Sequence, residues 1–253
     1  MCKEIKQSLR GHSRLDYIPE VLEPKVRGRA HHLDNWALAR ADRGHYAPRN
    51  AYEDSLQILG YQSTISAPHM HAKAVELLLP YLLPHSEQHI SSEEETIGIR
   101  GRTRGILDIG SGSGFLVHVF AELAGETSVV VGVEHIEDLR TFGEANMRKS
   151  AGGAALLASK RVRFCLGDGR QGWSELDTIG GSLPDDDGCD VIHVGAAAVR
   201  LHDELVRQLR SLGRLFIPVA EIEGDWFSDK WYIWAVDKGN ICKAQYVSLI
   251  DAP

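Results

Sequence analysis

Three alternating glycines stand where an apolar strand gives way to a helix, and they form a candidate ligand site. Gly110, Gly112 and Gly114 follow the apolar run at residues 106–109, and apolar residues at helical spacing occupy residues 116–123. Glycine lets the backbone turn sharply and lets a ligand approach within contact distance. We therefore expect a strand, a glycine turn and a helix that hold a nucleotide-like ligand at the helix N-terminus. A tight turn without a ligand is the alternative.

The residues on either side of this turn distinguish between possible ligands. A dinucleotide-binding turn has glycine at its first, third and sixth positions, but the sixth position here is Phe115. Asp108 lies just before the turn, where its carboxylate would repel a pyrophosphate and attract a cation. S-adenosylmethionine carries a sulfonium, an ammonium group and no phosphate. The sequence thus favours S-adenosylmethionine over NAD.

Two further acidic residues follow predicted strands. Glu134 ends the β-branched strand expected at residues 128–133, close to where α/β folds place the acid that binds a ribose diol. Asp168 lies between two glycines after the strand expected at residues 161–166. It can accept a hydrogen bond from an adenine amino group, although a plain Asx turn explains it equally well. We expect Asp108 and these two acids to converge on one crevice at the carboxyl ends of the strands.

A second group of polar residues precedes another predicted helix. Pro68 is typical of a first helical turn, and an apolar stripe follows it. Thr64, Ser66, His69 and His71 crowd this turn. The local pattern favours Ser66 as a helix cap, whereas the crowding of polar side chains indicates a binding or catalytic site.

Strands and helices alternate along most of the chain. A helix is expected from residue 137 to about 150, strands at 189–194 and 213–219, and a helix between these strands that runs to about residue 210. This alternation predicts an α/β fold of the Rossmann-like class with a largely parallel central sheet. Segments 231–236 and 244–249 form a plausible hairpin. We expect this C-terminal antiparallel hairpin to close the sheet.

Composition restricts the environment and the partners of the chain. The formal net charge of −7 disfavours a nucleic-acid surface. Four scattered cysteines have neither disulfide nor metal spacing, which predicts reduced thiols and no metal site. The absence of an apolar span or signal peptide predicts a cytosolic protein that does not bind membranes. We expect a monomer with one domain at 41–253, surface insertions near 84–104 and 174–188, and a divergent segment at 1–40.

Several motifs together resemble one enzyme family. These are ADRGHY at 41–46, TISAPHMHA at 64–72, LDIGSGSGFL at 107–116, GDGRQGW at 167–173, VIHVGAAA at 191–198 and GRLFIPV at 213–219. They are similar to the protein-L-isoaspartate O-methyltransferases, and the resemblance extends from about residue 41 to residue 253. The stretches YIWAVDK and DAP near the C-terminus are similar to fungal members.

The resemblance implies an S-adenosylmethionine-dependent enzyme that methylates the free α-carboxylate of L-isoaspartyl residues in age-damaged proteins and peptides. The ester then collapses without enzyme to a succinimide. The implied active-site residue is Ser66, which would orient the acceptor. No general base is required because a carboxylate is ionised at neutral pH. The implied cofactor site, with the glycine turn included, comprises Ser63, Thr64, Ile65, Ser66, His71, Asp108, Gly110, Gly112, Ser113, Glu134, His135, Asp168 and Gly169.

Some positions depart from the family pattern and support an alternative. Leu56 and Ser248 stand where the family has proline, Ile250 stands where it has a ligand-binding threonine, and the loop at 237–245 is shortened. With the altered N-terminus, these departures favour a non-catalytic binding module that recognises isoaspartyl or other peptide ends. The intact serine and acids favour the enzyme. A methyltransferase acting on RNA or a small molecule is disfavoured by the acidic charge and by TISAPHMHA.

Overall fold

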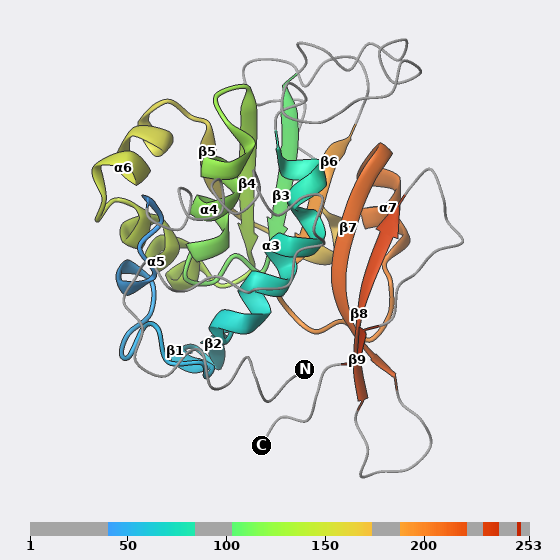
Figure 1. Ribbon diagram of the computed structural model, residues 1–253, viewed down its shortest axis with the longest axis horizontal. Helices are drawn as coiled ribbons and strands as arrows, with labels where there is room; N and C mark the ends of the chain where they lie inside the picture. The colour runs from blue at the N-terminus through green and yellow to red at the C-terminus, as the bar shows by residue number, and fades with distance from the viewer. Residues whose placement is uncertain (1–39, 84–102, 174–187, 222–229, 238–246, 249–253) are drawn as a thin grey trace, which may run out of the picture.

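The computed structural model describes residues 40–83, 103–173, 188–221, 230–237 and 247–248. The predicted N-terminal segment 1–40, apart from its last residue, lies outside this part of the chain. So do Ile250 and almost all of the two predicted insertions. The described residues form a small two-stranded sheet and a seven-stranded sheet that helices flank (Figure 1).

The seven-stranded sheet confirms the predicted α/β fold. Its strand order is β5-β4-β3-β6-β7-β8-β9, and the first five of these strands run parallel. The last two run antiparallel to their neighbours, as the predicted terminal hairpin requires. The strands are β3 (Arg104–Ile109), β4 (Ser128–Glu134), β5 (Val162–Leu166), β6 (Cys189–Val194), β7 (Leu209–Glu221), β8 (Lys230–Asp237) and β9 (Val247–Ser248).

The direction in which successive strands are added to the sheet reverses next to β3. The chain moves outward from β3 through β4 to β5, then returns to place β6 on the other side of β3. Open α/β sheets bind ligands at the carboxyl ends of the strands at such a switch point. Asp108 of β3 is the register partner of His193 of β6 there.

Alternating residues of the central strands pack into two buried cores, one on each face of the sheet. On β3, Ile106 packs with residues of α3 and α4, whereas its neighbour Leu107 packs with Leu205 of α7. Figure 1 shows α3 crossing in front of the sheet, with α5 and α6 towards one side. The helices are α3 (Pro68–Leu82), α4 (Phe115–Ala124), α5 (Glu137–Met147), α6 (Ala151–Ala158) and α7 (Asp203–Gln208), with short 3-10 turns η1 (Arg43–His45) and η4 (Gly169–Gln171).

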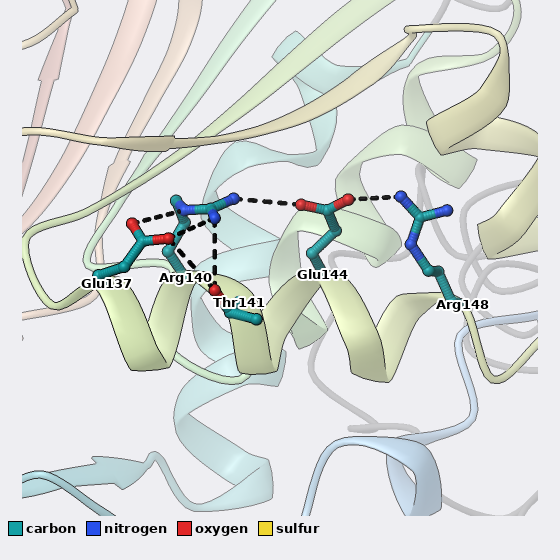
Figure 2. Close-up of polar contacts among 5 residues, drawn as sticks. All are labelled: Glu137, Arg140, Thr141, Glu144 and Arg148. Carbon is teal, nitrogen blue, oxygen red and sulfur yellow. Dashed lines mark hydrogen bonds and ion pairs between the residues drawn. The ribbon is translucent and has the colours of Figure 1, made fainter.

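Helix α5 combines an internal glycine with a row of charge pairs. Gly143 packs against the glycine turn, and glycine inside a helix costs about 1 kcal/mol relative to alanine. Arg140 contacts Glu137 at 2.5 Å and Glu144 at 3.2 Å, and Arg148 contacts Glu144 at 2.5 Å (Figure 2). Such pairs contribute about 0.2–0.5 kcal/mol each in helices. The row therefore offsets much of the cost of the glycine.

Three local features differ from the sequence-based expectation. A hairpin of β1 (Gln57–Gly60) and β2 (Ser63–Ile65) was not predicted. The helix expected to reach about residue 150 ends at Met147, and a separate α6 follows because the Ser150 side chain caps it by accepting from the Gly153 amide. The helix expected to reach about residue 210 ends at Gln208, because β7 already begins at the next residue.

Candidate active site

A pocket lies at the carboxyl ends of β3 and β6. Its walls come from β2 and the start of α3, from the glycine turn after β3, from the end of β6, and from β7. The structure therefore brings together two sequence motifs that are more than thirty positions apart in the chain. The predicted site residues that line the pocket are Thr64, Ile65, Ser66, His71, Asp108, Gly110, Gly112 and Ser113.

The glycine turn has the conformation that its sequence predicts. Gly110, Gly112 and Gly114 have φ values of 72°, 50° and 83°, in the left-handed region that favours glycine. A Cβ atom on Gly114 would lie 2.9 Å from the carbonyl oxygen of Gly143 in α5. The turn can therefore be this tight, and this close to α5, only without side chains.

Ser66 enters the pocket directly from β2. The N-cap of α3 is Ala67, and no side chain caps this helix, so the expectation that Ser66 is a helix cap is wrong. Residues Thr64 and Ile65 pair with β1, and this pairing holds the strand that leads to Ser66. The Ser66 hydroxyl is therefore free to contact a ligand.

The two histidines of this turn, His69 and His71, lie in different surroundings. The Nδ1 atom of His69 lies 2.7 Å from Asp54, and half of the His69 side chain is exposed. His69 is absent from the pocket lining, whereas His71 belongs to it. The Nδ1 atom of His71 lies 2.7 Å from Nη1 of Arg43. Burial and the Arg43 guanidinium lower the pKa of His71 well below its usual value, so its ring is neutral at pH 7.

Arg43 is a site residue that the sequence did not reveal. Its side chain is almost fully buried, at 2% exposure. Besides contacting His71, it donates from Nε to the carbonyl of Ala51 at 2.6 Å and from Nη2 to the carbonyl of Ser66 at 2.7 Å. Arg43 occurs in the ADRGHY motif, but nothing in the local pattern shows that an arginine there is buried.

A second unforeseen residue, His193, forms the far wall of the pocket. Its Nδ1 atom lies 2.6 Å from Oδ1 of Asp108, and both side chains are buried. Its ring stacks on Phe216, with 5.1 Å between centroids, and meets the edge of Phe120. His193 is a polar residue in a mostly apolar strand, and its role did not follow from the sequence because its alignment with Asp108 depends on the order of the strands.

Glu134 supports the glycine turn from the end of β4. One carboxylate oxygen accepts a hydrogen bond from the amide of Gly112 at 3.1 Å. The other accepts from the amides of His135 at 2.8 Å and Ile136 at 3.2 Å. The His135 ring is largely exposed, with its Nδ1 atom 3.0 Å from Glu134. Glu134 lies next to the pocket-lining turn without lining the pocket.

Asp168 forms the Asx turn that was its alternative explanation. It accepts from the amide of Arg170 at 3.0 Å and contacts Nη2 of Arg170 at 2.8 Å. These hydrogen bonds lower the pKa of Asp168 to about 2. A Cβ on Gly169 would meet the Ile109 side chain at 2.1 Å, so this glycine lets η4, which follows β5, pack on the end of β3. Asp108, Glu134 and Asp168 thus lie at or just after the ends of three neighbouring strands, but Asp108 alone among them lines the pocket. Ser63, His135 and Gly169 also lie outside the lining.

The chemistry of the pocket suits a cationic ligand. Among the described residues that line it, Asp108 is the acid and none is lysine or arginine. A phosphate would meet this buried carboxylate without a cation beside it, whereas a sulfonium or ammonium group would be attracted. The glycine turn, which brings bare backbone to the pocket, supports the same conclusion.

This parallel sheet, with a glycine turn at its switch point and acids at successive strand ends, defines a Rossmann-like methyltransferase fold of the S-adenosylmethionine-dependent class. The sequence profile of the family Protein-L-isoaspartate(D-aspartate) O-methyltransferase (PCMT) matches residues 27–91 and 94–247. The chain belongs to this family.

Individual relatives agree with the family match. Over 191 residues the chain is 38% identical to protein-L-isoaspartate O-methyltransferase 1 of Arabidopsis thaliana, covering 75% of this chain and 70% of that protein. It is 36% identical to the Caenorhabditis elegans protein-L-isoaspartate O-methyltransferase over 189 residues, 75% of this chain and 71% of that protein. A Plasmodium falciparum protein-L-isoaspartate O-methyltransferase, solved with S-adenosyl-L-homocysteine, superposes with a TM-score of 0.67 at 25% identity, covering 90% of this chain and 93% of that one.

Proposed function

We propose that this chain methylates the free α-carboxylate of L-isoaspartyl residues in damaged proteins and peptides, with S-adenosylmethionine as methyl donor. The observation that carries the proposal is the pocket that joins the Ser66 turn to the glycine turn at the switch point. Membership of the family supports an enzyme and does not favour the alternative of a non-catalytic binding module.

The donor and the pocket fit chemically. When bound, S-adenosylmethionine supplies an electrophilic methyl group on a positively charged sulfur, and the carboxylate of Asp108 offsets positive charge in the pocket. Glu134, held beside the glycine turn, is suited to bind a ribose diol, and Asp168 is suited to an adenine amino group. We propose that the cofactor is held by Ser63, Thr64, Ile65, Ser66, His71, Asp108, Gly110, Gly112, Ser113, Glu134, His135, Asp168 and Gly169.

The reaction needs alignment more than it needs acid or base catalysis. In the proposed reaction an ionised carboxylate oxygen would take the methyl group that the bound cofactor supplies, and the electron pair of the broken carbon–sulfur bond would stay on sulfur. No proton is transferred, because the acceptor is already deprotonated at neutral pH. His71 is unsuited to act as a base, since Arg43 donates to its Nδ1 atom and its pKa is low. The Ser66 hydroxyl would orient the acceptor oxygen by donating a hydrogen bond.

The apolar part of the pocket contributes by excluding water. Phe115, Phe216 and Ile65 line it, and all three side chains are buried. The carboxylate and the sulfonium lose their charges as the bond forms. A dry pocket therefore favours the transition state over the charged reactants.

The test is transfer of labelled methyl from S-adenosylmethionine to a peptide containing L-isoaspartate, beside its aspartate twin. Label on the isoaspartyl peptide alone is the expected result. If no label is transferred while calorimetry still detects cofactor binding, the non-catalytic binding module is favoured instead.

The role of Ser66 is tested by Ser66→Ala, which should lower kcat about tenfold, the effect of one lost hydrogen bond, with cofactor affinity nearly unchanged. Ser159→Ala is the matched control, because Ser159 follows α6 and its hydroxyl donates to the carbonyl of Leu156. Wild-type turnover in Ser66→Ala would remove the proposed role.

The cellular setting forms part of the proposal. We propose a cytosolic monomer that acts on damaged polypeptides. Cys165 and Cys189 are free thiols, as in proteins of reducing compartments. No helix in the described part of the chain is long and apolar enough to cross a membrane. Cell fractionation and size-exclusion chromatography with light scattering test the location and the monomeric state.

A further inference from the structure

Arg43 connects three separate parts of the site from behind the pocket wall. It lies in η1, and its donors reach Ala51, Ser66 and His71, which are 8, 23 and 28 positions away in the sequence. Ser66 and His71 line the pocket, whereas Arg43 does not. Because Arg43 does not line the pocket, it acts on a ligand through the residues that it holds.

The contact with His71 determines which ring nitrogen carries the proton. A guanidinium has five N–H donors and no acceptor, so the Nδ1 atom of His71 must accept the hydrogen bond at 2.7 Å. In a neutral ring the proton is then on Nε2. Because Nδ1 faces Arg43 behind the wall, the Nε2–H edge is the part of the ring that can reach a ligand.

Phe115 keeps both partners in place. Its ring centroid lies 5.1 Å from that of His71 and 5.3 Å from the Cζ atom of Arg43. The histidine therefore cannot rotate freely to exchange its two nitrogens. The pocket thus presents a fixed N–H donor, backed by a cation, in addition to the carboxylate of Asp108.

We propose that Arg43 is a positioning residue that holds His71 as an Nε2–H donor for a carboxylate bound in the pocket. Two carboxylates enter this pocket in the proposed reaction: that of the amino-acid part of the cofactor, and the isoaspartyl acceptor. The second source rests on the proposed function, whereas the first requires cofactor binding alone.

The first experiment is long-range 15N–1H NMR of the histidine rings in the wild-type protein, with His71→Gln used to assign the His71 signals. The expected spectrum shows His71 as the neutral tautomer with its proton on Nε2. A ring protonated on Nδ1, or on both nitrogens at pH 7, would overturn the proposal. This measurement needs neither turnover nor an altered Arg43.

The second experiment is a double-mutant cycle of Arg43→Lys and His71→Gln. Glutamine offers an amide N–H near the position of Nε2–H without needing Arg43 to select a tautomer. In the wild-type background we expect Arg43→Lys to weaken ligand binding about tenfold, the effect of one charge-assisted hydrogen bond. In the His71→Gln background the same change should weaken it about twofold. Equal fold-changes in both backgrounds would contradict action through His71.

The readouts distinguish the two carboxylates. A higher calorimetric Kd for S-adenosylmethionine identifies the cofactor carboxylate, and an unchanged Kd with a higher KM for the isoaspartyl peptide identifies the acceptor. If neither constant changes, the proposal is wrong. Arg161→Lys is the matched control, since Arg161 is a partly buried arginine that also donates to a backbone carbonyl, that of Ala121 at 3.1 Å, away from the pocket. It should lower thermal stability and leave both constants unchanged.

Discussion

At the scale of single residues, Phe115 shows how one position can both exclude a ligand and build a site. A dinucleotide-binding turn requires glycine there, so phenylalanine indicates a different cofactor. In the structure its side chain is 2% exposed, and its ring contacts His71, Arg43 and the edge of Tyr46, with 5.6 Å between the Tyr46 and Phe115 centroids. The aromatic ring at this position therefore also supports His71 and Arg43 of the site.

Asp168 provides a prediction at the same scale. Its side chain is 43% exposed and pairs with Arg170, so it contributes little to stability. We expect Asp168→Ala to raise the Kd for S-adenosylmethionine about tenfold in calorimetry, because a charge-assisted hydrogen bond to the cofactor would be lost. The thermal midpoint should stay the same.

Glu137→Gln is the control for Asp168→Ala. Glu137 is also exposed and paired with an arginine, but its partner lies along α5 (Figure 2). The control should leave the Kd unchanged. An unchanged Kd in Asp168→Ala would remove Asp168 from the cofactor site.

At the scale of elements, the strands of the sheet were predictable and the entry hairpin was not. Short apolar runs rich in β-branched residues, such as 128–133, are typical of buried strands. The β1–β2 turn instead places Tyr61 and Gln62 at φ values of 52° and 57°, without the Asn-Gly or Asp-Gly signature of such turns. The residues 151–158, which include two glycines, gave no helical signal, although they form α6.

The residues of the site likewise divide into those that the sequence predicts and those that it does not. The glycine turn and Ser66 could be found because each belongs to a short local pattern. Arg43 and His193 could not, because their defining contacts join positions 28 and 85 apart in the sequence. Such pairings depend on strand order and helix placement, which local propensity does not determine.

The packing of α5 on the glycine turn leads to a prediction about elements. Alanine at position 143 would favour the helix by about 1 kcal/mol. Its Cβ would, however, lie 2.9 Å from the carbonyl oxygen of Gly112 and 3.4 Å from the amide nitrogen of Gly114. We expect Gly143→Ala to displace the turn, lower the thermal midpoint and weaken S-adenosylmethionine binding about tenfold in calorimetry.

Gly152→Ala in α6 is the control for this change. A Cβ there meets Glu122 at 3.6 Å, which is an ordinary contact. The control should bind the cofactor like the wild type and be equally or slightly more stable. Wild-type affinity in Gly143→Ala would show that the turn does not depend on the close approach of α5.

At the scale of the whole molecule, the two ends of the parallel strands have different tasks. Near their amino ends, buried Asp190 pairs with Arg210 at 2.7 Å and accepts from the amide of Gly105 at 2.9 Å, which joins β6, β7 and β3. The Nε and Nη2 atoms of Arg214 donate hydrogen bonds to the carboxylate of Asp237 at 2.6 and 2.7 Å, which joins β7 to β8. These ion pairs hold the sheet together at a distance from the ligand pocket, and the carboxyl ends carry the polar groups of the site.

The buried polar groups of the site nevertheless affect the stability of the whole molecule. His71 has a lowered pKa in the folded state because of burial and its neighbours Arg43, His193 and His69. Below about pH 6.5 the unfolded chain therefore binds a proton at this residue that the folded chain does not. The contribution of His71 to the free energy of unfolding is fully present above this pH and falls as the pH decreases, by up to about 1.4 kcal/mol per pH unit.

Urea unfolding between pH 8 and pH 5 measures this effect, because most carboxylates stay ionised over this range. The wild type should lose stability below about pH 6.5 more steeply than His71→Gln, which lacks the titrating ring. Ser159→Ala, which changes no titrating side chain, should give a curve parallel to that of the wild type. Parallel curves for the wild type and His71→Gln would mean that the ring takes up its proton in the fold as readily as in the unfolded chain. Arg43 would then not keep His71 neutral.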